Sequence, residues 1–278
     1  MQWNLVSDSS CNQLSLETPD ENIRFSTVPF AIRVDGVEFL DDDALDCGKL
    51  VDAMVNCRET SETACPSPEA WRTQFERPGN VIALTISGAL SGSYNSACAA
   101  RELVLEKEPD RNIAVIDTRS TGPEMTLLIR KLQEWIAAGI DFESVVCKAR
   151  RYLESTRIIF ALSSYNNLIQ NGRMNRFVGM LAHKLGIWGV GIGSETGTIK
   201  IRKIARGSRR AVEVILEDMV ERGKHGAAVV IDHCENPEFA RKLEAALLAR
   251  WPHLEVTVRG TRGLCSYYAE KNGVIVGY

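Results

Sequence analysis

The feature that most constrains the fold of this chain is its succession of short apolar runs separated by helical patterns. Along the middle of the chain these segments follow one another as strand 81–86, helix 94–106, strand 112–116, helices 126–138 and 142–152, and strand 158–162. Strands that alternate with helices of this length are typical of βαβ units, in which neighbouring strands run parallel. The first half of the chain is therefore predicted to form a largely parallel sheet.

The pattern changes after residue 158. A glycine-rich run at 186–193 and several strands follow, with helical patterns at 209–222 and 237–250. A chain of 278 residues is long enough for two ordinary domains. We predict an α/β protein with an N-terminal domain over residues 1–158, built on a parallel sheet, and a smaller C-terminal domain over 159–278, built on a mixed sheet.

Composition narrows the classes of function. Apolar residues make up 45% of the chain and charged residues 25%, which is typical of a globular protein with a core. The net charge of −3 gives no attraction to nucleic acid or to an anionic membrane surface. The sequence lacks an apolar run of about 18 residues and a secretory signal, so we expect a cytoplasmic protein without stable membrane insertion.

The cysteines and histidines give no sign of a metal centre. Eight cysteines are scattered along the chain without a C-x-x-C pair, and the four histidines are equally dispersed. In a reducing compartment such cysteines are expected to be free thiols. We therefore expect neither a metal nor another cofactor.

Residues 86–97, ISGALSGSYNSA, place serines and glycines where the 81–86 strand gives way to a helix. If Ser91 caps this helix, the amides of Gly92, Ser93 and Tyr94 lack partners within it and point outwards. The positive end of the helix dipole and the nearby hydroxyls would complete an anion site for a carboxylate or a phosphate. The alternative is a well-capped helix after a tight turn.

Two further segments carry candidate site residues. Thr63, in TACPS at 63–67, precedes a strong helix start and could donate its hydroxyl to the same cleft; the alternative is an ordinary loop threonine. Arg206 belongs to a basic cluster at 202–210 that could face a phosphate or an acidic partner, or could be a solvated face. GALSG at 88–92 is not the nucleophile elbow G-x-S-x-G, and we predict no catalytic residue.

Taken together, the motifs resemble the DegV family, the fatty-acid-binding subunits of bacterial fatty acid kinase. The resemblance extends over nearly the whole chain. It is carried by VSDSS at 6–10, TACPS at 63–67, ISGALSGSYNSA at 86–97, NGRM at 171–174 and RGSRRA at 206–211.

The resemblance implies a two-domain α/β protein that buries a long-chain fatty acid in an apolar tunnel. It implies that Thr63 and Ser91 hold the carboxylate, in agreement with the anion site expected at the amides of Gly92 and Ser93. Family members do not transfer phosphate themselves but present the fatty acid to an ATP-dependent kinase partner. We therefore expect a lipid-binding protein rather than an enzyme.

The sequence departs from the family pattern near its end. The family has H-x-G-P-G where this chain has AEKNG at 269–273, so Ala269 replaces a histidine. In the family that histidine lies near the carboxylate and works with the arginine matched by Arg206. The resemblance thus implies lipid binding more strongly than participation in phosphorylation. Two alternatives stay open: an acyl-transfer or hydrolytic enzyme with Ser91 as nucleophile, and a binder of another small anionic lipid.

Overall fold

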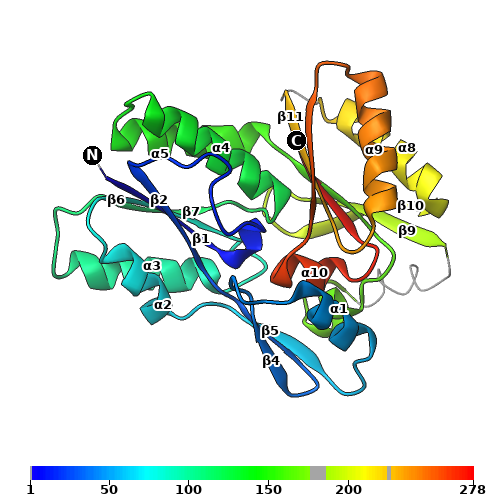
Figure 1. The fold of residues 1–278 in the computed structure, drawn as a ribbon, viewed down its shortest axis with the longest axis horizontal. Coiled ribbons are helices and arrows are strands. Elements are labelled where there is room, and N and C mark those ends of the chain that lie inside the picture. The colour runs from blue at the N-terminus through cyan, green and yellow to red at the C-terminus, as the bar shows by residue number, and fades with distance from the viewer. Residues whose placement is uncertain (1, 176–185, 224–226) are drawn as a thin grey trace.

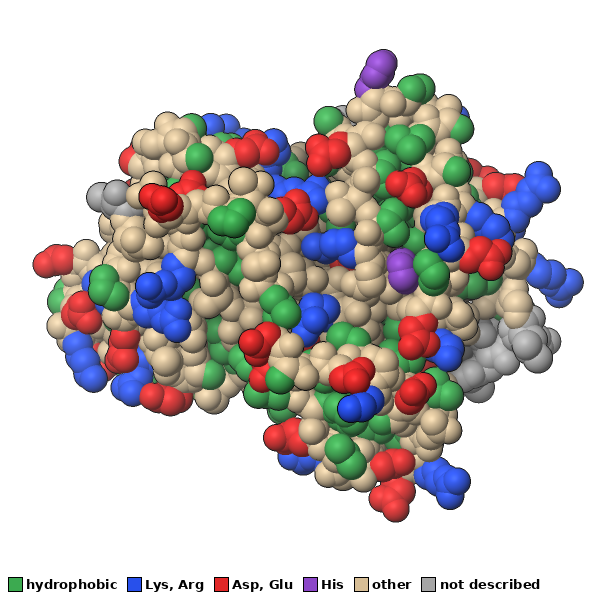
Figure 2. All heavy atoms as spheres, viewed as in Figure 1, with side chains coloured by type: hydrophobic (Ala, Val, Ile, Leu, Met, Phe, Trp, Pro, Cys, Tyr) green, Lys and Arg blue, Asp and Glu red, His purple; other side chains and the backbone are tan. Residues whose placement is uncertain are grey.

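The computed structural model describes residues 2–175, 186–223 and 227–278. Within them the chain forms two large sheets, a small third sheet and the helices that cover them (Figure 1). None of the helices in these three ranges is both long and apolar enough to cross a membrane. Acidic and basic side chains are interspersed over the face shown in Figure 2, in keeping with the small net charge.

The first sheet is parallel throughout, as predicted. Its strand order is β2-β1-β6-β7. Helices α2 and α3 pack on one face and α4 and α5 on the other, each pair around its own apolar core (Figure 1). The elements are β1 (Trp3–Asp8), β2 (Ile23–Val28), β6 (Asn80–Thr85), β7 (Ile113–Asp117), α2 (Pro68–Phe75), α3 (Ser93–Leu105), α4 (Pro123–Ala137) and α5 (Phe142–Ser155), with the short η1 (Ser9–Cys11) after β1.

The second sheet is mixed, also as predicted. Its order is β10-β9-β8-β13-β11-β12, and only the β11–β12 pair is parallel. Helices α8 and α9 cover one face, and α4 contacts the other at β11 and β13. The elements are β8 (Ile158–Leu162), α6 (Asn166–Gln170), β9 (Ile187–Gly193), β10 (Ile199–Arg206), α8 (Gly207–Glu221), β11 (Ala228–His233), α9 (Pro237–Arg250), β12 (Glu255–Gly260) and β13 (Val274–Gly277). The chain thus enters this sheet at Ile158, and the division into two domains there stays a prediction.

A third, antiparallel sheet of order β4-β3-β5 was not predicted. Its strands are β3 (Ala31–Val34), β4 (Val37–Leu40) and β5 (Ser61–Ala64), and it packs with α1 (Cys47–Val55) and α10 (Gly263–Ala269). The loop interpretation of Thr63 was wrong, because Thr63 lies in β5 opposite Ile32 of β3. This sheet brings the N-terminal half of the chain against a helix near the C-terminus.

Candidate ligand tunnel

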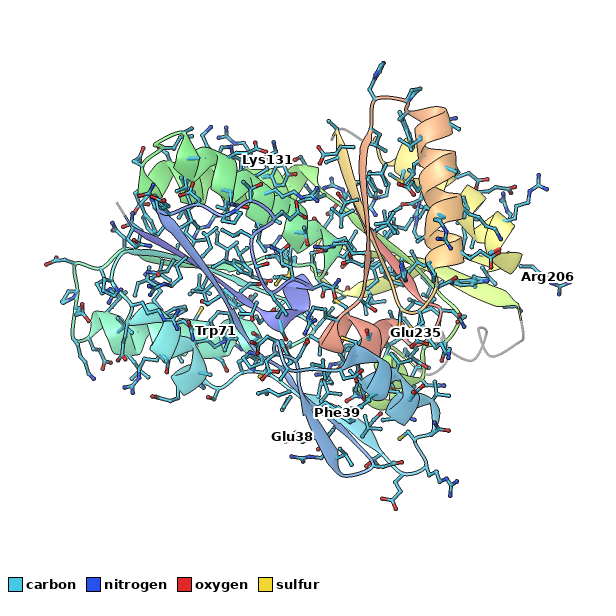
Figure 3. All side chains as sticks on the ribbon, viewed as in Figure 1. Glu38, Phe39, Trp71, Lys131, Arg206 and Glu235 are labelled. Carbon is cyan, nitrogen blue, oxygen red and sulfur yellow. The ribbon has the colours of Figure 1, made fainter. Side chains whose placement is uncertain are left out.

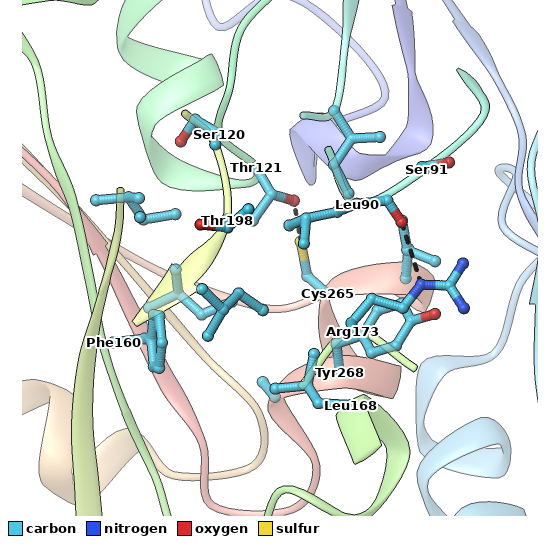
Figure 4. Close-up of a pocket in the computed structure, with 18 of the residues that line it drawn as sticks. Leu90, Ser91, Ser120, Thr121, Phe160, Leu168, Arg173, Thr198, Cys265 and Tyr268 are labelled. Carbon is cyan, nitrogen blue, oxygen red and sulfur yellow. Dashed lines mark hydrogen bonds between the residues drawn. The ribbon is translucent and has the colours of Figure 1, made fainter. Parts of the chain in front are cut away.

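A narrow cavity lies where the three sheets meet (Figure 4). The space in it that the centre of a water-sized sphere can occupy is about 90 Å³. Most of its walls are apolar side chains from β8, α6, β10, α10 and β13 and from the residue after β6, among them Ile86, Ile158, Phe160, Leu162, Leu168, Ile199, Leu264 and Ile275. Such walls suit a thin, extended apolar ligand, and we call this cavity the tunnel.

Two of the predicted residues, Thr63 and Ser91, line the tunnel together. Thr63 Oγ1 is 2.7 Å from the phenol oxygen of Tyr268, so the two hydroxyls share a hydrogen bond. Ser91 Oγ accepts a hydrogen bond of 3.3 Å from the amide of Ser93. Hydroxyls from β5, from the loop before α3 and from α10 are therefore gathered in one otherwise apolar cavity.

Arg173 adds a cation to the same cavity. Its Nε donates to the main-chain oxygen of Leu90 at 3.1 Å, and its Nη1 donates to that of Asn171 at 2.5 Å. Its guanidinium carbon is 5.8 Å from the centroid of the Tyr268 ring, within the range of a cation–π contact. These contacts, with main-chain oxygens and an aromatic ring, hold the positive charge beside the tunnel (Figure 4).

Gly92 and Ser93 are placed differently from the prediction. Helix α3 begins at Ser93, and Gly92 rather than Ser91 is its N-cap residue, without a side-chain capping bond. The Ser93 hydroxyl is buried and donates to Asp8 Oδ2 at 2.7 Å, and neither Gly92 nor Ser93 lines the tunnel. Ser91 therefore contributes as a tunnel-lining hydroxyl and not as the cap of the helix.

Asp8 anchors this corner from beneath. Its carboxylate is buried and accepts hydrogen bonds from Ser10 Oγ at 2.5 Å, Ser93 Oγ at 2.7 Å and the Ile86 amide at 2.9 Å. Burial raises the pKa of Asp8 to about 6, although the hydrogen bonds oppose the shift. The carboxylate thus ties β1 to the end of β6 and to the start of α3, on either side of the loop that carries Ser91.

Arg206 does not take the place that the resemblance implied. It is the last residue of β10, its side chain is exposed at the outer edge of the molecule (Figure 3), and it does not line the tunnel. Arg173, not Arg206, is the cation that lies beside the Tyr268 ring and the loop that carries Ser91. Ala269 does line the tunnel, at the end of α10, and the residue before it supplies the phenol that contacts Thr63.

Arg173 and Tyr268 are the site residues that sequence reasoning missed. Arg173 lies within the quoted NGRM motif, which could have nominated it. Tyr268 gave no such signal, because it reaches the tunnel from α10, a helix that the sequence pattern did not reveal. Over the ranges that the structure describes, no histidine lines the tunnel and no cluster of side chains is suited to hold a metal ion.

Comparison with known proteins identifies the family. The sequence model of the DegV family matches residues 2–277. The chain belongs to the DegV family. A DegV domain-containing protein of Streptococcus pneumoniae is 38% identical over all 278 residues, which cover 99% of that protein.

Solved structures of DegV-family proteins share the fold. The fatty acid kinase (Fak) B3 protein of Streptococcus pneumoniae, loaded with linoleic acid, superimposes with a TM-score of 0.97 at 38% identity, covering 100% of this chain and 99% of that one. A DegV family protein of Eubacterium eligens, loaded with heptadecanoic acid, gives a TM-score of 0.94 at 35% identity, covering 99% and 98%. The predicted family and fold class are thereby confirmed.

Proposed function

We propose that this protein binds one long-chain fatty acid, with its carboxylate at Thr63 and Ser91 and its acyl chain along the tunnel. The observation that carries the proposal is the tunnel itself, an apolar cavity in which the hydroxyls of Thr63, Ser91 and Tyr268 are gathered beside Arg173. Arg173 and Tyr268 complete the set of carboxylate-binding residues. The ligands of the Streptococcus pneumoniae and Eubacterium eligens structures, linoleic and heptadecanoic acid, support this choice.

The chemistry of the cavity matches both ends of such a ligand. Burying a carboxylate costs free energy unless the group is paired with a cation and hydrogen-bonded. Arg173 can supply the positive charge, and the nearby hydroxyls can supply the hydrogen bonds. Each methylene buried along the walls contributes about 0.8 kcal/mol, so a long chain gains affinity without further polar contacts. A small anionic lipid with a short or bulky tail would use the walls less well, and we do not favour it.

We further propose that the protein carries its ligand to a fatty acid kinase and does not transform it. The support is the 38% identity, over the full length, to a protein named for that kinase. Arg206 is exposed at the molecular edge, where it could contact a partner. Ala269 stands where the resemblance places the family histidine, and the neighbouring Tyr268 offers a hydroxyl there.

An acyl-transfer enzyme with Ser91 as nucleophile is less well supported. A serine nucleophile needs a base within hydrogen-bond reach. In the structure Ser91 Oγ accepts from a main-chain amide, and the described part of the tunnel wall contains no histidine.

Native mass spectrometry of the purified protein tests the proposal. We expect one fatty acid per chain, and tight uptake of added linoleate or palmitate by the lipid-free protein. The pair Ser91→Ala and Thr63→Ala should bind at least tenfold more weakly, while Ser67→Ala, which removes a helix cap outside the tunnel, should bind normally. Absence of both bound lipid and uptake would sink the proposal. Ester hydrolysis abolished by Ser91→Ala would favour the enzyme instead.

A further inference from the structure

A second cavity lies on the other side of the tunnel wall. The space in it open to the centre of a water-sized sphere is about 620 Å³. Arg119, Ile158 and Gly193 line both cavities, so a single layer of residues separates them. The second cavity is bordered by the end of β7, the end of α5 and the turn after β9, and its charged lining residues are Asp117, Arg119, Glu124, Arg150, Glu154, Arg157, Glu195 and Arg222. We call it the arginine cavity.

Four acids line this cavity, and in the part of the chain that the structure describes none of them forms an ion pair with its arginines. Glu154 and Glu195 are exposed, and the other two are hydrogen-bonded elsewhere. Asp117 Oδ1 accepts from the amides of Gly88 and Arg119, at 3.0 and 2.9 Å. Glu124 is buried and accepts from two hydroxyls, Ser120 Oγ at 2.5 Å and Thr156 Oγ1 at 2.7 Å. Burial raises the pKa of Glu124, so its uncharged form is more favoured than that of an exposed glutamate.

The arginines, for their part, have few charged partners. Arg119 donates to the main-chain oxygen of Glu195 at 3.3 Å. Arg157 donates to the main-chain oxygens of Glu154 and Thr156. Among the residues that the structure describes, Arg119, Arg150 and Arg157 form no ion pair with an acid.

The fourth arginine is only weakly paired. Arg222 Nη1 is 3.7 Å from Asp218 Oδ2, and the other oxygen of that carboxylate is 3.1 Å from Arg202 Nε. Arg222 Nη1 is buried and has no hydrogen-bond partner within the described ranges. Four arginines thus line one polar cavity, and within the described ranges none of them forms an ion pair with the four acids that line it as well.

We propose that the arginine cavity binds a phosphate group, held by Arg157 and Arg222 with Arg119 and Arg150 at its sides. Guanidinium groups present paired N–H donors that match the oxygens of a phosphate, and a doubly charged anion would offset several of them at once. The position agrees with the chemistry, because β7 ends here and ligands of parallel α/β sheets bind outside the carboxyl ends of the strands. This site does not depend on the fatty acid site.

The group could belong to free phosphate or to a phosphomonoester, and calorimetry can separate the two sources. Inorganic phosphate and methyl phosphate are titrated separately into the full-length protein, at a low ionic strength held constant with chloride. We expect saturable binding of at least one of them, with one site per chain. Binding of methyl phosphate at least as tight as that of phosphate would identify a phosphomonoester site, and binding of phosphate alone a site for the free anion.

Variants place the binding in the cavity. Arg157→Gln combined with Arg150→Gln should weaken phosphate binding at least tenfold, and Arg150→Gln alone, at an exposed position on α5, should weaken it severalfold without affecting folding. Arg209→Gln is the matched control, because that side chain is 95% exposed on α8 and lies outside the cavity.

Two results would overturn the proposal. One is the absence of saturable phosphate binding by the wild-type protein, and the other is an equal loss of phosphate affinity in the control and in the cavity variants. Uptake of linoleate, measured on the same samples, should be unchanged by Arg157→Gln and Arg150→Gln. Failure of the phosphate site can therefore be distinguished from failure of fatty acid binding.

Discussion

Gly191 controls how much room the tunnel has, and replacing it tests the tunnel directly. Gly191 of β9 pairs with Phe160 of β8, and Phe160 lines the tunnel. A Cβ atom on Gly191 would lie 2.4 Å from Phe160 Cζ and 2.8 Å from the main-chain oxygen of Lys200. The aromatic ring thus occupies space that only glycine leaves free.

The size of the effect of Gly191→Ala follows from these distances. Carbon atoms in contact need about 3.5 Å, so the ring edge must move by about 1 Å. The main chain of Lys200 limits movement of the new methyl group away from the ring, and we expect the ring to move into the tunnel. Overpacking of this kind costs about 1–3 kcal/mol of stability. If the last three methylenes of an 18-carbon chain lose their burial, binding weakens by about 2.4 kcal/mol, or roughly 50-fold.

Competition between fatty acids of different length is the assay. Gly191→Ala should bind 18-carbon acids far more weakly than the wild type and 12-carbon acids nearly as well. Gly260→Ala is the matched control, because its added Cβ has no atom of the described residues within 4 Å apart from those of its chain neighbours, and its φ is not left-handed. Equal loss of long and short acids in a folded variant, or no loss of either, would refute this account of the tunnel.

Three further outcomes follow from the site. Tyr268→Phe should weaken fatty acid binding severalfold, by about 1 kcal/mol, because it removes the hydroxyl bonded to Thr63. In a Thr63→Ala background the loss of binding free energy should be smaller, which a double-mutant cycle measured by calorimetry would show. Arg173→Met should weaken binding about 10- to 100-fold in the same titrations, with partial recovery in Arg173→Lys, whereas equal affinity of wild type and Arg173→Met would exclude the cation from the carboxylate site. Because the pKa of Asp8 is raised to about 6, the native state holds the Asp8 proton more tightly than the unfolded chain does, so the contribution of Asp8 to stability is lost as pH rises from 4 to 6. Between these pH values the free energy of unfolding, measured with urea, should fall by about 2–3 kcal/mol less in Asp8→Asn than in the wild type. Parallel pH profiles of the two proteins would contradict this.

The parallel sheet and its helices could be predicted from the sequence because their signals are local. Each strand of the parallel sheet from β6 on is a continuous apolar run, and each following helix has its own periodic pattern. The corner at Ser91 was likewise recognisable, since it combines a strand end, glycines and hydroxyls within a few residues. Thr63 was nominated because it precedes a strong helix start, although its own strand was missed.

The small sheet and α10 were missed because their signals are not local. Strand β5 is four residues long and alternates half-buried with exposed positions, so nothing in its composition distinguishes it from a loop. Helix α10 is seven residues long and almost wholly buried, so it shows no amphipathic period. Both elements are stabilised by tertiary contacts with segments that lie far from them in the sequence, and a single sequence does not display such contacts.

The docking of α10 shows why the carboxylate site belongs to the tertiary fold rather than to a motif. Asp41, just after β4, is buried and accepts the amide of Leu264 at 2.8 Å. Gly263 approaches so closely that a Cβ there would overlap the Asp41 side chain. This contact sets the helix beneath the small sheet and thereby brings Tyr268 to Thr63, a residue 205 positions earlier in the chain. The carboxylate that anchors α10 lies outside the tunnel lining, so the role of Tyr268 could not be inferred from the residues around it in the sequence.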